Sequence, residues 1–311
     1  MFDGIGHLDT QYYESDDCRI IHDDCLNALR VLEDNSVDLY IADPPYWKVV
    51  GEKWDYQWKT EDQYIAWCIP WLKEIYRTLR YGGTFYLFGY FRTLALLVPF
   101  LREYGFDLRQ QIILNKGLRA VSGRATRNYK LFPNVTESIL FLIKDNIPYS
   151  RKILKERQRE RRLSAQEINE ALGVKSNGGG MWSIYTGKNV CEQFPTAELW
   201  EKLQKILDFS CPYKKIAQTF NPQMGVTDVW EDIDFYSERR FHPTQKPQKL
   251  LTRLILASSN ENDIVVDPFA GSGSTLFAAK HLKRKCIAIE KDLEFYNTIV
   301  ARMQEEENSL F

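Results

Sequence analysis

The sequence predicts an α/β protein with a doubly wound, mostly parallel sheet. Short apolar runs rich in β-branched and aromatic residues alternate with segments of helical period along most of the chain. Two of these runs end in an aspartate followed by proline, at Asp43 and at Asp267. Strands that alternate with helices form a parallel sheet covered on both faces. The 311 residues are enough for one such domain and an insertion.

The predicted strands are apolar runs of about five residues, each followed by polar or turn-forming residues. They span Arg19–Asp24, Asp38–Ala42, Thr84–Phe88, Gln111–Leu114, Ser138–Ile143, Asp263–Val266 and Lys285–Ile289. The predicted helices carry apolar residues three and four positions apart. They span Cys25–Leu32, Gln63–Arg80, Thr93–Tyr104, Pro247–Ser259, Ser274–Leu282 and a last helix that begins at about Leu293. Gly82 and Gly83 are expected to end the second helix.

The alternation is interrupted between residues 145 and 235. Charged, helix-like sequence gives way there to three consecutive glycines and then to polar segments with aromatic residues. Ser164 and Glu167 have the spacing of a capping box, which predicts a short helix. We therefore predict three parts: residues 1–144 and 236–311 form the two halves of one sheet domain, and residues 145–235 form an inserted module.

Composition and the distribution of apolar residues argue against a membrane protein, a secreted protein and a zinc protein. The longest apolar run is too short to span a bilayer, and the N-terminus lacks the basic and apolar regions of a secretion signal, so we expect a cytoplasmic protein without a membrane segment. The 6 cysteines and 4 histidines are dispersed, without a Cys-x-x-Cys pair. This pattern predicts free thiols and no structural zinc.

The second aspartate motif has the form of a ligand cradle. Residues 267–275 read as a strand end, a tight turn with two glycines and the start of a helix. Helix N-termini and free backbone N–H groups gather at this edge of a parallel sheet. Glu290 ends the next strand, where a carboxylate can accept both hydroxyls of a ribose. Leu276 replaces the third glycine of a dinucleotide fingerprint, and no Gly-Lys-Thr follows, so neither that motif nor a P-loop is present.

The first aspartate motif, Asp43-Pro44-Pro45-Tyr46, suits chemistry on an amino group. An exocyclic amine of a base is a poor nucleophile, because its lone pair is delocalised into the ring. The Asp43 carboxylate and the Pro44 carbonyl are two acceptors for the N–H bonds of such an amine, and the prolines hold the turn rigid. Tyr46 offers a flat face for stacking. No covalent intermediate is needed.

With these motifs the chain resembles the DNA amino-methyltransferases in which the catalytic motif precedes the cofactor motif. The resemblance implies a circularly permuted, Rossmann-like fold, S-adenosylmethionine as cofactor and residues 145–235 as a target-recognition insert. It implies Asp43, Pro44, Pro45 and Tyr46 as catalytic residues. It implies a cofactor site made of Asp24, Cys25, His242, Thr244, Gln245, Lys246, Asp267, Phe269, Gly271, Ser272, Gly273, Ser274 and Glu290. Trp47 departs from the Asn often found at that position, which leaves the substrate pocket less defined.

Two basic segments suggest double-stranded DNA as partner, although the net charge is only −1. The predicted DNA contacts are Arg119, Arg124, Arg127, Arg157, Arg159, Arg161, Arg162 and Trp182. Two alternatives stay open. The arginine run can be a solvated helix face, and Trp182 can belong to the core of the insert.

The resemblance implies methylation of N6 of adenine, because Asp rather than Ser stands at position 43. The target base must be flipped out of the duplex into the pocket. Three alternatives stay open. The enzyme can methylate N4 of cytosine, or it can methylate an amine of a protein or small molecule. The chain can also be a catalytically silent DNA-binding subunit. Methylation of a cytosine ring carbon typically needs a Pro-Cys nucleophile, and here Cys211 precedes Pro212 instead. The recognised sequence, pairing of two copies and a partner restriction endonuclease stay open.

Overall fold

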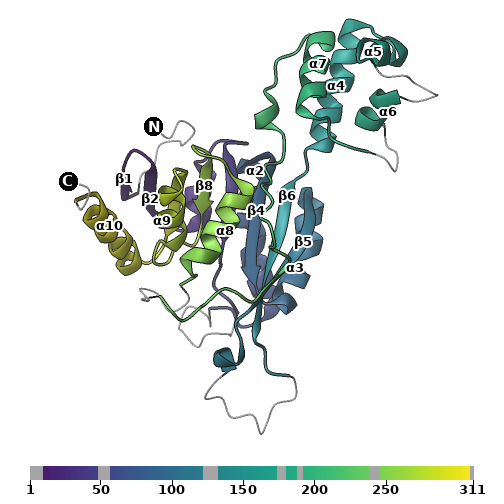
Figure 1. Ribbon diagram of the computed structural model, residues 1–311. Coiled ribbons are helices and arrows are strands. Elements are labelled where there is room, and N and C mark those ends of the chain that lie inside the picture. Colours follow the sequence, from purple (N-terminus) through teal and green to yellow (C-terminus); the bar gives the residue numbers. More distant parts are fainter. Residues whose placement is uncertain are drawn as a thin grey trace.

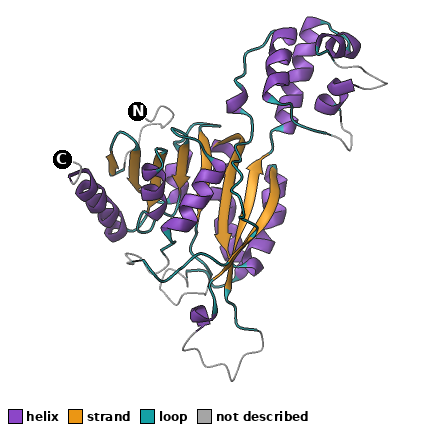
Figure 2. Ribbon diagram, in the orientation of Figure 1, coloured by secondary structure: helices purple, strands orange, loops and turns teal. Residues whose placement is uncertain are grey.

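The computed structural model describes residues 10–47, 57–121, 132–173, 180–187, 192–238 and 245–308. Within them, one sheet has the strand order β1-β2-β9-β8-β3-β4-β6-β5-β7 (Figure 1, Figure 2). The strands are β1 (Tyr12–Glu14), β2 (Cys18–His22), β3 (Val37–Ala42), β4 (Leu79–Gly89), β5 (Phe106–Asn115), β6 (Thr136–Lys144), β7 (Val229–Trp230), β8 (Ile264–Asp267) and β9 (Lys285–Glu290).

The central strands β2, β9, β8, β3 and β4 run parallel to one another. β1 is antiparallel to β2, and β6 is antiparallel to both β4 and β5. Helices cover both faces of this sheet, which confirms the predicted fold class. They are α1 (Cys25–Arg30), α2 (Glu61–Thr78) and α3 (Phe91–Tyr104) on one face, and α8 (Gln248–Ser258), α9 (Ser274–His281) and α10 (Leu293–Asn308) on the other.

The alternating side chains of the strands explain this layering. In β3, Leu39 and Ile41 join the core under α8, α9 and α10, whereas Tyr40 and Ala42 join the core under α1, α2 and α3. Successive side chains of a strand point to opposite faces, so a strand buried on both sides reads as a continuous apolar run. The predicted strand that ends at Ala42 has this form.

The expected end of the second helix at Gly82 and Gly83 is wrong. α2 ends at Thr78, and both glycines lie inside β4. Gly82 has φ +72°, and a Cβ atom there would lie 2.5 Å from the carbonyl oxygen of Ile216. Glycine at this position therefore allows a later segment of the chain to pack directly against the strand.

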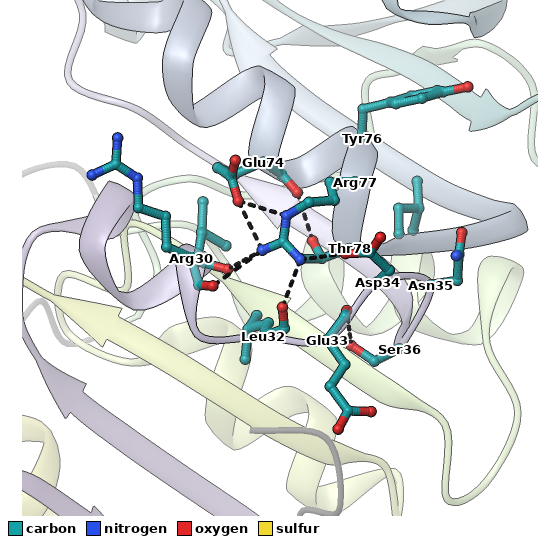
Figure 3. A network of polar contacts seen from close by, with 12 residues as sticks. Arg30, Leu32, Glu33, Asp34, Asn35, Ser36, Glu74, Tyr76, Arg77 and Thr78 are labelled. Atoms are coloured by element: carbon teal, nitrogen blue, oxygen red, sulfur yellow. Dashed lines mark hydrogen bonds and ion pairs between the residues drawn. The ribbon is translucent and has the colours of Figure 1, made fainter. Parts of the chain in front are cut away.

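Arg77 of α2 stabilises the C-terminal end of α1 through hydrogen bonds (Figure 3). Its guanidinium donates to the carbonyl oxygens of Leu29 at 3.0 Å and Leu32 at 2.8 Å, and it pairs with the carboxylates of Asp34 and Glu74. The last carbonyls of a helix have no partner within the helix, so a cation there stabilises the end. The network anchors the helix whose first turn lines the cavity described below.

The inserted segment forms a separate helical module that projects from one end of the sheet (Figure 1). Its helices are α4 (Ile147–Arg161), α5 (Ala165–Ala171), α6 (Gly180–Thr186) and α7 (Ala197–Leu207). Ser164 and Glu167 make the expected capping box. The module has its own core, which extends from Leu154 to Ile216. By contrast, Trp230, Ile233 and Phe235 belong to the core of the sheet, so the helical part is shorter than 145–235.

Strand directions place the module far from the C-terminal ends of β3 and β8. β6 begins beside the last residue of β4, where Ser138 pairs with Gly89, and it ends at Lys144 at the opposite edge. The module follows Lys144 directly. From Glu137 to Lys144 the strand covers roughly 24 Å, at about 3.4 Å per residue. No helix among the described residues is long and apolar enough to cross a membrane.

Candidate active site

The two aspartate motifs meet because β3 and β8 are neighbouring parallel strands, with Leu39 opposite Val265. Both strands therefore deliver their last residues to one edge of the sheet. A cavity of about 470 Å³ lies at this edge, and it is lined by the loop after β3, the loop after β8, the start of α1 and the residues after β9. Tyr46 and Phe269 both line it. Its volume is in the range of small-molecule sites.

The loop after β8 is held by hydrogen bonds to carboxylates. The N–H of Phe269 donates to Asp267 Oδ1 at 3.0 Å, and the N–H of Gly271 donates to Glu290 Oε2 at 2.7 Å. Gly273 has φ +81°, and a Cβ atom there would come within 2.9 Å of Ile299. A larger residue would therefore disturb this turn. Burial raises the pKa of Asp267 to about 7.

The start of α1 forms a second wall. Asp24 caps this helix, because its Oδ1 accepts from the N–H of Leu26 at 3.0 Å, and its Oδ2 accepts from Lys291 at 3.0 Å. Cys25 is buried, and burial raises the pKa of its thiol. Asp24 and Cys25 both line the cavity, as does Trp67 of α2. The Trp67 ring lies 5.8 Å from that of Phe269, so two aromatic side chains face this part of the cavity together.

A cluster of charged side chains surrounds the loop after β3. Asp43 Oδ2 accepts from Lys246 Nζ at 2.6 Å, and Asp43 Oδ1 accepts from the Tyr46 hydroxyl at 2.5 Å. Lys246 Nζ lies 3.0 Å from Oε1 of Glu137, whose Oε2 accepts from Lys116 at 2.7 Å. Asp43, Tyr46 and Lys246 line the cavity. Two lysines and two carboxylates thus form one compact group beneath it.

Burial and neighbouring charges shift the pKa values of Asp43 and Glu137 in opposite directions. Burial raises the pKa of Asp43; Lys246 opposes that rise and Glu137 adds to it. Burial alone would also raise the pKa of Glu137, but Lys246 and Lys116 together lower it to about 2. Glu137 therefore stays ionised at neutral pH, and Asp43 is the better proton acceptor of the pair.

Comparison with known proteins identifies the family. The family model described as DNA methylase, of the N6/N4 type, matches residues 37–301, which include both aspartate motifs. The chain is a DNA methyltransferase of the N6/N4 family.

Curated relatives and solved structures agree with this assignment. The chain is 28% identical to the type II methyltransferase M.HpaI of Haemophilus parainfluenzae, over 94% of this chain and 76% of that protein. It is 29% identical to the DNA adenine methyltransferase YhdJ of Escherichia coli, over 91% of this chain and 82% of that protein. The fold is similar to that of the M1.HpyAVI–SAM complex (TM-score 0.53, 21% identity, 92% of this chain and 99% of that chain). It is also similar to that of the cytosine-N4-specific PvuII methyltransferase (TM-score 0.58, 16% identity, 95% and 90%).

The methyltransferase family uses S-adenosylmethionine, the cofactor predicted from the sequence, and the cavity suits it. Carboxylate oxygens of Asp24 and Glu290 at the rim can accept hydrogen bonds from hydroxyl and amino groups. The aromatic faces of Phe269 and Trp67 suit a flat ring or a sulfonium. The narrow turn at Gly271 brings backbone close to a ligand. When bound, S-adenosylmethionine supplies a methyl group on a positively charged sulfur.

The structure brings most predicted site residues of the methyltransferase to this one cavity. Those that line it are Asp24, Cys25, Asp43, Pro44, Pro45, Tyr46, Gln245, Lys246, Asp267, Phe269, Gly271, Ser272, Ser274 and Glu290. Gly273 shapes the turn beside it. His242 and Thr244 lie outside the described residues. The Lys246 ammonium, predicted at the cofactor, contacts Asp43 and Glu137.

The predicted DNA contacts are spread over two ends of the methyltransferase. Arg119 follows β5 at the edge that carries the cavity, is exposed, and lies 5.0 Å from the ring of Tyr236. The arginines of the insert lie on α4 or at its end, beyond the opposite edge; they are Arg157, Arg159, Arg161 and Arg162. Arg124 and Arg127 lie outside the described residues.

The prediction that Trp182 contacts DNA needs correction. Its side chain is only 4% exposed and packs in the core of the helical module, so it cannot stack on a base or reach a phosphate without unfolding the module. The alternative kept from the sequence, that Trp182 belongs to the core of the insert, describes the structure, and Tyr185 is buried in the same core. An aromatic residue at helical spacing is ambiguous until its burial is known.

Sequence reasoning missed Glu137 and Trp67 as residues of this region. Glu137 is the second residue of β6, a strongly apolar strand, and it is buried. A carboxylate at a position that must be buried needs a cationic partner, so this was a usable signal. Trp67 carries no comparable signal, because it stands among other apolar positions of α2.

Proposed function

We propose that this methyltransferase modifies N6 of adenine in double-stranded DNA at a specific sequence. The observation that carries the proposal is the Asp43 carboxylate, which lies at the cavity edge with Pro44 and Tyr46 next to it. The name of the relative YhdJ as an adenine methyltransferase supports adenine. Cytosine N4 is the second candidate, because the PvuII enzyme of similar fold acts there.

In the proposed reaction the residues of the loop after β3 act on the target amine. The Asp43 carboxylate and the Pro44 carbonyl accept the two N–H bonds, which favours tetrahedral geometry at nitrogen and directs its lone pair to the cofactor side of the cavity. Once methylated, the nitrogen is cationic and must lose a proton. Asp43 receives it, and the raised pKa of this buried carboxyl makes it a better base than an exposed aspartate.

The remaining roles follow the two walls of the cavity. We propose that Glu290 accepts the ribose hydroxyls, that Asp24 and Cys25 contact the adenine ring of the cofactor, and that Gln245 belongs to the methionine end. Ser272 supports this placement of Gln245, since its hydroxyl donates to Gln245 Oε1 at 3.3 Å.

The identity of the methylated base is tested by digesting DNA after reaction and analysing its nucleosides by mass spectrometry. DNA from a host without methyltransferases, which contains all four bases, should yield N6-methyladenine as the new nucleoside. N4-methylcytosine would overturn the choice of base but not the family. If S-adenosylmethionine binds in calorimetry and no modified nucleoside appears, the catalytically silent alternative is supported.

We propose that the arginines of α4 contact DNA phosphates away from the flipped base. Replacing Arg157, Arg159, Arg161 and Arg162 with Ala should weaken DNA binding and flatten its salt dependence by about 0.9 in slope for each phosphate that is no longer neutralised. Lys283→Ala is the control, because this exposed lysine lies between α9 and β9 next to Glu261. Internal pairs such as Arg157 with Glu160, at 2.7 Å, reduce the available charge. An unchanged slope in the fourfold variant would show that the run is a solvated helix face.

The setting in the cell is part of the proposal. The relatives M.HpaI and M.HinfI are named type II methyltransferases, which favours a restriction–modification system with a cognate endonuclease. We propose a cytoplasmic location, where the DNA of a bacterial cell lies.

A further inference from the structure

Asp43 and Glu137 are joined twice, by a hydroxyl and by an ammonium. The Tyr46 oxygen lies 2.5 Å from Asp43 Oδ1 and 2.5 Å from Glu137 Oε1. Lys246 Nζ lies 2.6 Å from Asp43 Oδ2 and 3.0 Å from the same Glu137 oxygen. The carboxylates differ in access: the Asp43 side chain is 19% exposed and lines the cavity, whereas that of Glu137 is 0% exposed and does not.

Both oxygens of Asp43 already have a donor. Lys246 donates to Oδ2, and Oδ1 is 2.5 Å from the Tyr46 hydroxyl, whose one proton is shared between Asp43 and Glu137. A target amine that enters the cavity needs one of these oxygens, so it competes with the donors already there for the same carboxylate. An ammonium presents N–H bonds to a carboxylate as an amine does. Lys246 therefore competes with the base for Asp43 Oδ2.

Glu137 offers Lys246 a second partner within reach. A buried ammonium that lost its only carboxylate would carry a large desolvation cost. Because Glu137 Oε1 is already 3.0 Å from Nζ, Lys246 can leave Asp43 and remain paired in the buried cluster. Lys116 holds the other oxygen of Glu137 at 2.7 Å, which keeps this carboxylate ionised and in position.

We propose that Lys246 is an exchangeable placeholder for the target amine and that Glu137 holds its ammonium while the base is in the pocket. Both are positioning residues, since neither needs to touch the reacting atoms. The inference rests on the proposed amino-group methylation, with Asp43 as the acceptor. It assigns a function to Glu137, which lies in β6, outside both motifs.

The test compares Glu137→Gln, Lys246→Met and the double variant in single-turnover methylation of duplex DNA. Glu137→Gln should slow the reaction roughly tenfold or more, because Lys246 loses its alternative carboxylate and stays on Asp43. Adding Lys246→Met should restore a large part of the rate, since no ammonium then competes with the amine. If the pair only supported the fold, the double variant would be slower than either single one. That result, or full activity of Glu137→Gln, would overturn the inference.

The pH dependence of the methylation rate gives a second test, because the two substitutions should shift it in opposite directions. The charged or titratable groups that face Asp43 are Lys246, Glu137, Tyr46 and Asp267, with Lys116 behind Glu137. Lys246 lowers the pKa of Asp43, so Lys246→Met should move the acid limb of the rate profile to higher pH. Glu137 raises that pKa, so Glu137→Gln should move the limb to lower pH. Shifts in the same direction for both variants would contradict the assignment.

A binding measurement keeps the inference testable if a Glu137 variant does not fold. With 2-aminopurine next to the target adenine, Lys246→Met should increase the fluorescence of the enzyme–DNA complex, because the vacated position favours flipping of the adenine, which unstacks its neighbour. An unchanged signal would count against the placeholder. Binding of S-adenosylmethionine should change less than about threefold in every variant, since these substitutions lie on the substrate side of the cavity. Failure of the proposed function is separate, because it would appear as absence of N6-methyladenine with the wild-type enzyme.

Discussion

Asp43→Ala should lower the rate of methylation by roughly 10²–10³-fold or more, as expected when a preorganised acceptor is removed from a buried site. The variant loses the acceptor for the amine proton and the carboxylate that holds the amine. Lys246 keeps Glu137 as a partner at 3.0 Å, so the buried cluster retains one ion pair and the protein should fold. Single-turnover kinetics on duplex DNA give the rate.

Two comparisons separate this role from a structural one. Asp43→Asn retains an acceptor oxygen but cannot take up the proton, so its rate should lie between those of the wild type and the alanine variant. Calorimetry should show cofactor affinity nearly unchanged in both, because Asp43 lies on the side of the cavity formed by the loop after β3. Undiminished activity of Asp43→Ala would refute the assignment of this residue.

Glu290→Ala should weaken S-adenosylmethionine binding by roughly 100-fold, since hydrogen bonds to a charged acceptor contribute about 1.5–3 kcal/mol. Part of this loss is indirect. Glu290 Oε2 accepts from the N–H of Gly271 at 2.7 Å, and its Oε1 accepts from that of Asp292 at 2.8 Å, so the carboxylate also holds the turn. Isothermal titration calorimetry with the cofactor alone measures the effect.

Glu290→Gln separates the contact with the cofactor from the hydrogen bonds that hold the turn. The glutamine carbonyl can still accept from Gly271, but its NH₂ group cannot accept from a ribose hydroxyl. We expect an affinity between those of Glu290→Ala and the wild type. Glu294→Ala is the matched control, because Glu294 is an exposed carboxylate in the first turn of α10. Equal affinity of Glu290→Ala and wild type would remove Glu290 from the cofactor site.

The local elements were predictable because their signals are local. Strands β3 and β8 read as apolar runs, and the site residues Asp43 and Asp267 come directly after β3 and at the last position of β8. The exception at Gly82 is instructive. A Gly-Gly pair after a helical pattern predicts a helix end, but α2 had already ended at Thr78. Gly82 is needed for close packing against Ile216, a residue that comes much later in the chain.

The doubly wound fold, the family, the cofactor and the two motifs that line one cavity were all predictable from the sequence, since each depends on hydrophobic period or on residues adjacent in the chain. Three further points required the folded structure. It buried Trp182 in the core of the module, placed the arginines of α4 beyond the far edge of the sheet, and joined Glu137 of β6 to Lys246 and Asp43. Burial and ion pairing depend on neighbours in space, and strand order, which no local pattern encodes, sets which residues become neighbours.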